Sequence, residues 1–132
     1  MFFANQNCWG NEMARIIKLP TFLTETGRLT VVEKLLPFDI KRIYYIYDVV
    51  GRRGGHRHKK TIQALVCLGG SCEIYVNNGA EEQLFVLDAP QKCLLVFPED
   101  WHTMDKFSPG AILLVCASEF YDQGDYIDEE YR

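Results

Sequence analysis

Short hydrophobic runs separated by turn-forming residues recur along this chain, and the pattern predicts an all-β domain. The runs are rich in β-branched and aromatic side chains, which suit a pleated and half-buried surface. Between two of them, Asn77-Asn78-Gly79 predicts a tight hairpin, because Asn and Gly adopt positive φ at little cost. The last segment, 119–132, mixes Tyr, Asp and Glu without a helical apolar stripe, so it predicts a short irregular or helical arm. The expected strands cover residues 29–34, 40–47, 61–68, 71–76, 83–87, 93–97, 101–107 and 111–117.

The length of 132 residues fits one domain, and neither a repeat nor a linker divides the chain. Met13 would itself make a credible start, so we expect residues 1–12 to be an appendage and residues 13–132 to form a single domain. Hydrophobic residues make up 48% of the chain and charged residues 24%, which is typical of a globular protein. This composition excludes intrinsic disorder as the main description of the chain.

Charge and hydropathy restrict the partners and the location. The net charge is −4, whereas proteins that coat nucleic acid usually carry a basic face, so no nucleic-acid partner is expected. No apolar run approaches the roughly 20 residues that span a bilayer, so no membrane association is expected. The five cysteines form no Cys-x-x-Cys pair, and three of them lie in apolar runs, where a free thiol acts as a small hydrophobe. This usage predicts a reducing, cytoplasmic location.

The unusual segment of the chain is residues 51–60, with the sequence GRRGGHRHKK. In an extended strand His56 and His58 point to the same face, because side chains alternate with period two. The glycines before them let the backbone turn sharply into such a strand. Two imidazoles on one face can bind a metal ion or act as an acid–base pair near neutral pH. The competing interpretation is a solvated basic loop without a chemical role.

A third histidine, His102, follows a turn at Pro98, and its spacing from the first two resembles the two-part motif of the cupin superfamily. In that pattern a His-x-His pair, a later Glu and a final His converge inside a small β-barrel. Here Gln63 stands where metal-binding members have the Glu, and a neutral amide lacks the anionic oxygen that a divalent cation prefers. We therefore expect no bound metal and no other cofactor.

Four segments together resemble the sugar 3,4-ketoisomerase family: residues 40–48 (IKRIYYIYD), 53–60 (RGGHRHKK), 63–72 (QALVCLGGSC) and 117–127 (ASEFYDQGDYI). The resemblance implies a small antiparallel β-barrel or jelly roll of cupin type. It also implies an isomerase that moves the keto group of dTDP-4-keto-6-deoxyglucose from C4 to C3 through an enediol. Such a reaction belongs to the biosynthesis of nucleotide-linked 3-amino-3,6-dideoxy sugars for surface glycans.

The family pattern also implies roles for individual residues. His56 is the base that removes the C3 proton, and His58 moves protons between the neighbouring oxygens. Each imidazole suits this work, because it can take or give a proton near neutral pH. Arg53 is expected to bind the diphosphate, since a guanidinium offers phosphate oxygens a planar fork of donors. The resemblance further implies a homodimer, which would cover the sheet edges and apolar surface of a small aromatic-rich barrel.

Further side chains are expected to line the sugar site. Tyr44 and Tyr45 are adjacent, so only one of them faces the interior, and we favour Tyr45 as a hydrogen-bonding group near the sugar. Gln63 is expected to bond a sugar hydroxyl or to orient a histidine. His102 is expected to line the cavity without abstracting a proton. Asp105 is a carboxylate that can tune or supply the second proton, with a purely surface position as its alternative.

Three other functions fit parts of the same pattern. A metal-dependent cupin enzyme would use His56, His58 and His102 as ligands, but Gln63 argues against it. A non-catalytic module would bind a nucleotide sugar without turnover. A nucleotide-sugar 3,5-epimerase would exchange protons at C3 and C5 without moving the ketone, but the chain is short for that class.

Overall fold

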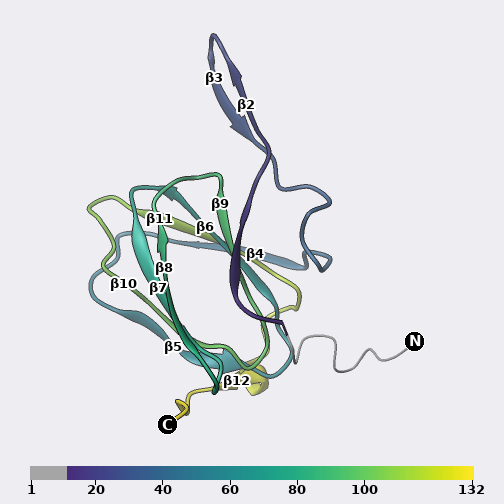
Figure 1. Ribbon diagram of the computed structural model, residues 1–132, viewed down its shortest axis with the longest axis vertical. Helices are drawn as coiled ribbons and strands as arrows, with labels where there is room; N and C mark the ends of the chain where they lie inside the picture. Colours follow the sequence, from purple (N-terminus) through teal and green to yellow (C-terminus); the bar gives the residue numbers. More distant parts are fainter. Residues whose placement is uncertain (1–11) are drawn as a thin grey trace.

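The computed structural model describes residues 12–132, which form two five-stranded antiparallel sheets and a separate two-stranded hairpin (Figure 1). The first sheet has the strand order β1-β9-β6-β11-β4. Its strands are β1 (Arg15–Lys18), β9 (Lys92–Val96), β6 (Gln63–Gly69), β11 (Ile112–Ala117) and β4 (Arg42–Ile46). The second sheet has the order β12-β5-β10-β7-β8. Its strands are β12 (Tyr126–Ile127), β5 (Arg53–His58), β10 (Trp101–Asp105), β7 (Cys72–Asn77) and β8 (Glu82–Leu87).

A hydrophobic core fills the space between the two sheets. Alternation along each strand turns every second side chain inward, so both sheets contribute to one cluster. The first sheet supplies Leu65, Cys67, Leu94, Val96, Leu113 and Val115, and the second supplies Cys72, Ile74, Val76, Leu87 and Met104. Burial of these apolar side chains is the main force that holds the sheets together. The predicted all-β antiparallel fold is confirmed.

A second cluster lies on the outer face of the first sheet, where residues 31–38 cross it. Val32, Leu36 and Phe38 from this segment pack against buried side chains of β6, β9 and β11. The prediction of a strand over residues 29–34 is therefore wrong beyond Thr30, where β3 ends. The apolar residues of that run are buried as a loop that covers the sheet, and this side-chain burial does not require strand pairing.

The hairpin of β2 (Thr21–Thr24) and β3 (Gly27–Thr30) projects away from the two sheets (Figure 1). Three large apolar side chains on it are exposed: Phe22, Leu23 and Leu29. Neither β1 nor β2 was predicted, because four residues are too few to show a period of two. The tight hairpin predicted at Asn77-Asn78-Gly79 is confirmed as the turn between β7 and β8.

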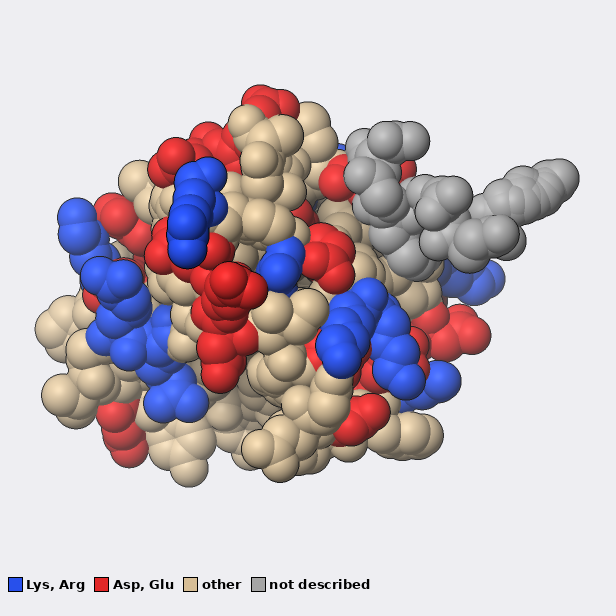
Figure 2. All heavy atoms as spheres, turned by 90° about the horizontal axis from the view of Figure 1, so that it is seen from below, with Lys and Arg blue, Asp and Glu red and all other residues tan. Residues whose placement is uncertain are grey.

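The C-terminal arm consists of a 3₁₀ turn (Gln123–Asp125) followed by β12, which pairs with β5. This agrees with the predicted short irregular or helical arm. The expectation for residues 1–12 falls almost entirely outside the described residues. Within 12–132, no helix is long and apolar enough to cross a membrane. Acidic and basic side chains are interspersed on the face seen in Figure 2.

Candidate active site

Three histidines gather on the inner face of the second sheet. His56 and His58 lie on β5, and His102 lies opposite His56 on the neighbouring strand β10. The ring centroids are 5.2 Å apart for His56 and His58, 5.3 Å for His56 and His102, and 6.3 Å for His58 and His102. The predicted convergence of the three imidazoles is confirmed. The alternative of a solvated basic loop fails, because His58 and His102 are buried.

A β-bulge at the start of β5 sets which side chains face this cluster. Gly54 and Gly55 have φ values of +86° and +83°, and the register between β5 and β10 shifts at this point. As a result Arg53 lies opposite Met104 and His56 lies opposite His102, so the side chains of Arg53 and His56 share one face of the sheet. Strict alternation would have turned Arg53 to the outer face. A Cβ on Gly54 would lie 3.0 Å from the carbonyl oxygen of His102, so a side chain there would be crowded by the backbone of β10 and strained by the positive φ.

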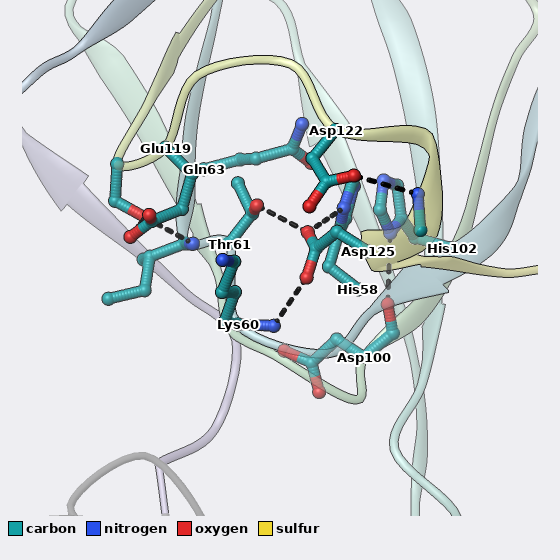
Figure 3. A network of polar contacts seen from close by, with 12 residues as sticks. His58, Lys60, Thr61, Gln63, Asp100, His102, Glu119, Asp122 and Asp125 are labelled. Atoms are coloured by element: carbon teal, nitrogen blue, oxygen red, sulfur yellow. Dashed lines mark hydrogen bonds and ion pairs between the residues drawn. The ribbon is translucent and has the colours of Figure 1, made fainter.

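His58 is held by a buried carboxylate from the C-terminal arm (Figure 3). Its Nδ1 lies 2.9 Å from Oδ2 of Asp125, which also accepts a 2.5 Å hydrogen bond from the Thr61 hydroxyl. The backbone N–H of Lys60 donates to Oδ1 at 2.8 Å. Burial by itself raises the pKa of Asp125, but these three donors outweigh it and hold the pKa below its ordinary value. Asp125 is therefore ionised at neutral pH.

The three imidazoles are neutral at pH 7. Burial, with the nearby charge of His58, lowers the pKa of His56 to about 4. Burial lowers the pKa of His102 to about 3, although its Nδ1 donates to the Asp100 carbonyl at 2.9 Å. Burial also lowers the pKa of His58, against the opposing effect of Asp125. Each ring therefore keeps one nitrogen lone pair that can accept a proton.

Aromatic and cationic side chains surround the histidines. Tyr126 packs against His56 and His58, with centroid distances of 4.8 and 4.4 Å. Tyr44 is half-buried, and burial raises the pKa of its hydroxyl to about 12. The charges of Arg42 and Arg53 oppose that shift, so both guanidinium groups act on the Tyr44 hydroxyl.

Arg42 lies over the rings of Tyr44 and Tyr121, at 5.3 and 5.6 Å from their centroids. Its Nε is buried without a hydrogen-bond partner among the described residues. A buried donor of this kind is suited to an anionic or carbonyl oxygen of a bound molecule.

Two predicted site residues lie elsewhere. The preference for Tyr45 is wrong: its side chain is 61% exposed on the outer face of the first sheet, and alternation turns Tyr44 inward instead. Asp105 also lies outside the site, in the surface position that was its alternative, because it shares the outer face of β10 with Trp101 and Thr103. There it lies 3.8 Å from Arg52 in an exposed ion pair, away from the inner face that carries His102.

Two other predicted residues, Gln63 and His102, lie inside the molecule. Gln63 is buried on β6 and donates a 2.9 Å hydrogen bond to the Tyr44 hydroxyl. His102 belongs to the histidine cluster, with its ring centroid 5.3 Å from that of His56. Within 12–132, no group of three or more His, Cys, Asp or Glu side chains is arranged to hold a metal ion.

Sequence reasoning missed Asp125, Thr61, Arg42 and Tyr126. Asp125 is separated from His58 by 67 positions, and no local pattern joins residues at such a distance. Asp125 and Tyr126 lie in the run 117–127 and Arg42 lies in the run 40–48, and both runs resemble the ketoisomerase family without indicating a role for these three residues.

Comparisons with known proteins identify the family of this chain. The family model FdtA, described as WxcM-like, C-terminal, matches residues 12–132. The TDP-4-oxo-6-deoxy-alpha-D-glucose-3,4-oxoisomerase of Aneurinibacillus thermoaerophilus is 43% identical over 117 residues, which are 86% of this chain and 84% of that protein. A 3,4-ketoisomerase from Helicobacter canadensis is 40% identical with a TM-score of 0.84, over 88% of this chain and 90% of that one.

A third relative is a histidine-to-asparagine variant of the 3,4-ketoisomerase QdtA from Thermoanaerobacterium thermosaccharolyticum, whose crystal structure contains TDP-4-keto-6-deoxyglucose. It is 42% identical with a TM-score of 0.84, over 88% of this chain and 87% of that one. The family match covers nearly the whole chain, and the identities extend over most of each relative. This chain belongs to the FdtA family of sugar 3,4-ketoisomerases.

Proposed function

We propose that this enzyme converts TDP-4-keto-6-deoxyglucose into its 3-keto isomer by histidine acid–base catalysis, without a metal or other cofactor. The observation that carries the proposal is the pair His56 and His58, two neutral imidazoles 5.2 Å apart in a buried site. The relatives support the substrate, since one is named for this reaction and another was crystallised with this nucleotide sugar.

The C3 proton of the substrate is acidic because it lies α to the C4 carbonyl. His56 removes this proton, and the electron pair moves onto the C4 oxygen to give an enediolate. His58 takes the proton of the C3 hydroxyl on its free lone pair and gives it to the C4 oxygen, and His56 returns its proton to C4 as the C3 carbonyl forms. The result is a C3 ketone and a C4 hydroxyl, with both histidines in their starting states. Base and acid assistance of this kind typically supplies about 10²- to 10⁴-fold in rate.

Cationic groups at the rim of the site would stabilise the negative charge on the substrate. The Nε of Arg42 is buried without a hydrogen-bond partner in residues 12–132, and it is suited to an enediolate oxygen or a sugar oxygen. Arg53 is exposed on the face that carries His56, where it would bind the diphosphate as a bidentate donor. Gln63 acts through Tyr44, whose hydroxyl it orients.

The finer architecture and assembly belong to the same proposal. The two sheets would make up a small barrel of cupin type, and two chains would form a homodimer. The exposed apolar side chains of the β2–β3 hairpin support the dimer. So does an apolar hollow on the outer face of the first sheet, lined by Tyr45, Tyr47, Leu68, Ile112 and Leu114. Light scattering should return the mass of two chains, and a monomer mass at micromolar concentration would refute the dimer.

The cellular setting is proposed on chemical grounds. The 3-keto product is a natural acceptor for an amino group, which fits a pathway to 3-amino-3,6-dideoxy sugars of surface glycans. Four buried free cysteines suit a reducing cytoplasm.

The test is incubation with TDP-4-keto-6-deoxyglucose in deuterated buffer, followed by NMR at C3, C4 and C5. We expect the ketone to move to C3 and solvent deuterium to appear at C4. Exchange at C3 and C5 without migration would indicate an epimerase. Saturable binding without exchange would indicate a binding module, and either result would overturn the proposal.

A further inference from the structure

We infer that Asp125 is the positioning residue for His58: its carboxylate fixes the ring tautomer so that Nε2 is the proton-accepting atom. This inference deepens the proposed function and rests on it for its catalytic meaning. The tautomer itself is a property of the folded protein and can be measured without turnover.

The donors around the carboxylate determine the tautomer. An ionised carboxylate only accepts hydrogen bonds, so the 2.9 Å contact requires that Nδ1 of His58 carries the proton. Both oxygens of Asp125 are already occupied by the Thr61 hydroxyl and the Lys60 N–H. The His58 and Asp125 side chains are only 2% and 3% exposed, so water does not replace these bonds. Nε2 of His58 is buried and has no partner among the described residues, which leaves its lone pair free.

The backbone holds the carboxylate in register with the histidine strand. Lys59 N–H donates to the Asp125 carbonyl at 2.9 Å, and Tyr126 pairs directly with His58 between β12 and β5. The 3₁₀ turn is closed by Asp125 N–H donating to the Asp122 carbonyl at 3.0 Å. The Asp122 side chain accepts from Gly124 N–H at 3.0 Å (Figure 3). These bonds, from the turn that precedes Asp125 and from the strand that follows it, hold Asp125 against β5.

The charged and titratable groups around His58 make the carboxylate necessary. His56, His102, Tyr126 and Arg42 surround the ring on the other sides, and none of them is a carboxylate. When His58 takes a proton from the substrate, its imidazolium therefore pairs with Asp125. Within 12–132, His58 is the one histidine of the three whose ring is hydrogen-bonded to a carboxylate. The arrangement suits a ring that carries a proton transiently between two oxygens.

The test is ¹⁵N NMR of the full chain labelled at histidine, with the His58 resonances assigned by their loss in His58→Asn. At pH 7 we expect Nδ1 protonated and Nε2 unprotonated in the wild-type protein. In Asp125→Asn, the side-chain oxygen must still accept from the Lys60 N–H, so the side-chain NH₂ group faces Nδ1 of His58. This NH₂ group donates to Nδ1, and the ring proton of His58 therefore moves to Nε2. We expect kcat of this variant to fall about 10³- to 10⁴-fold with KM little changed, because the base then presents N–H to the substrate.

Asp122→Asn is the matched control, because Asn keeps the acceptor for Gly124 and lies in the same turn. It should keep the wild-type tautomer and a kcat within about twofold. The inference is overturned if wild-type His58 carries its proton on Nε2, a result that stands even if Asp125→Asn does not fold. A folded Asp125→Asn with an unchanged tautomer, or an equal loss in Asp122→Asn, would overturn it as well. Absence of isomerisation by the wild-type enzyme would refute the proposed function and leave the tautomer measurement intact.

Discussion

Gln63 on β6 and Tyr44 on β4 are joined by a 2.9 Å hydrogen bond across β11, the strand that separates them. The amide of Gln63 is buried, and the Tyr44 hydroxyl is its acceptor on the inner face of the sheet. Tyr45, the next residue, faces solvent on the other side. The two tyrosines therefore provide a matched pair for testing which face carries function.

We expect Tyr44→Phe to lower the free energy of unfolding by about 1–3 kcal/mol, because it leaves the buried Gln63 amide without its acceptor. Tyr45→Phe should change it by less than about 0.5 kcal/mol, as is usual for an exposed side chain. Urea denaturation measures both values, and kcat should fall only in Tyr44→Phe. A greater loss of stability or activity in Tyr45→Phe would contradict the assignment of faces.

His56→Asn should abolish turnover while the protein stays folded and binds the nucleotide sugar. The imidazole is the proposed base at carbon, so its loss should lower kcat by at least about 10²-fold. His58→Asn should also be severe. Single-turnover kinetics and calorimetric binding of the nucleotide sugar separate the two effects. A His56→Asn enzyme with near-normal kcat would remove His56 from the mechanism, and a variant that fails to bind would point to a structural role.

Gly54→Ala should disrupt the bulge that positions Arg53 and His56. The added Cβ would lie 3.0 Å from the His102 carbonyl and 3.3 Å from Thr103 Cα, and the positive φ adds about 1–2 kcal/mol. Gly51→Ala is the control, since its φ is also positive at +81° but nothing lies within 4 Å of the added atom. The variant at 54 should lose more stability and far more activity than the variant at 51. Equal losses would show that backbone strain alone, and not the contact with β10, explains the glycine.

Local sequence was sufficient for most of the strands and for placing His56 beside His58, and the resemblance to the cupin motif added His102. The period of two placed His56 and His58 on one face, and the hairpin at Asn77 followed from turn chemistry. Local sequence does not decide which of two adjacent residues points inward when both side chains suit either face of the strand. Tyr44 and Tyr45 are chemically equal, so only the packing of β4 on the core decides between them. Arg53 faces the site because of the bulge in β5, and Asp125 lies there because β12 pairs with β5, which is far away in the sequence. A short motif encodes neither the bulge nor this pairing.

Stability should fall as the pH is lowered from about 6.5 to 4. The folded-state pKa of His56 is about 4 and that of His102 about 3, both below the unfolded value near 6.5. In this window the unfolded chain binds protons that the folded chain does not, so unfolding becomes more favourable as the pH falls. Urea midpoints measured from pH 7.5 to 4 should show a shallower decline in His56→Asn than in the wild type, and identical slopes would contradict the pKa of His56.

Catalysis should survive exhaustive chelation. Three histidines in a cupin-like arrangement invite a metal, but the lone pairs of His56 and His58 that would hold the ion are needed as proton acceptors. Nδ1 of His58 and Nδ1 of His102 donate to Asp125 and to the Asp100 carbonyl, and Gln63 donates to Tyr44. A cation on the remaining lone pairs would occupy the atoms that must accept protons, so a tightly bound ion would inhibit the proposed bases. Elemental analysis of the purified protein, with activity measured before and after chelation, tests this. Stoichiometric iron, zinc or manganese whose removal abolishes activity and whose return restores it would establish a metalloenzyme instead.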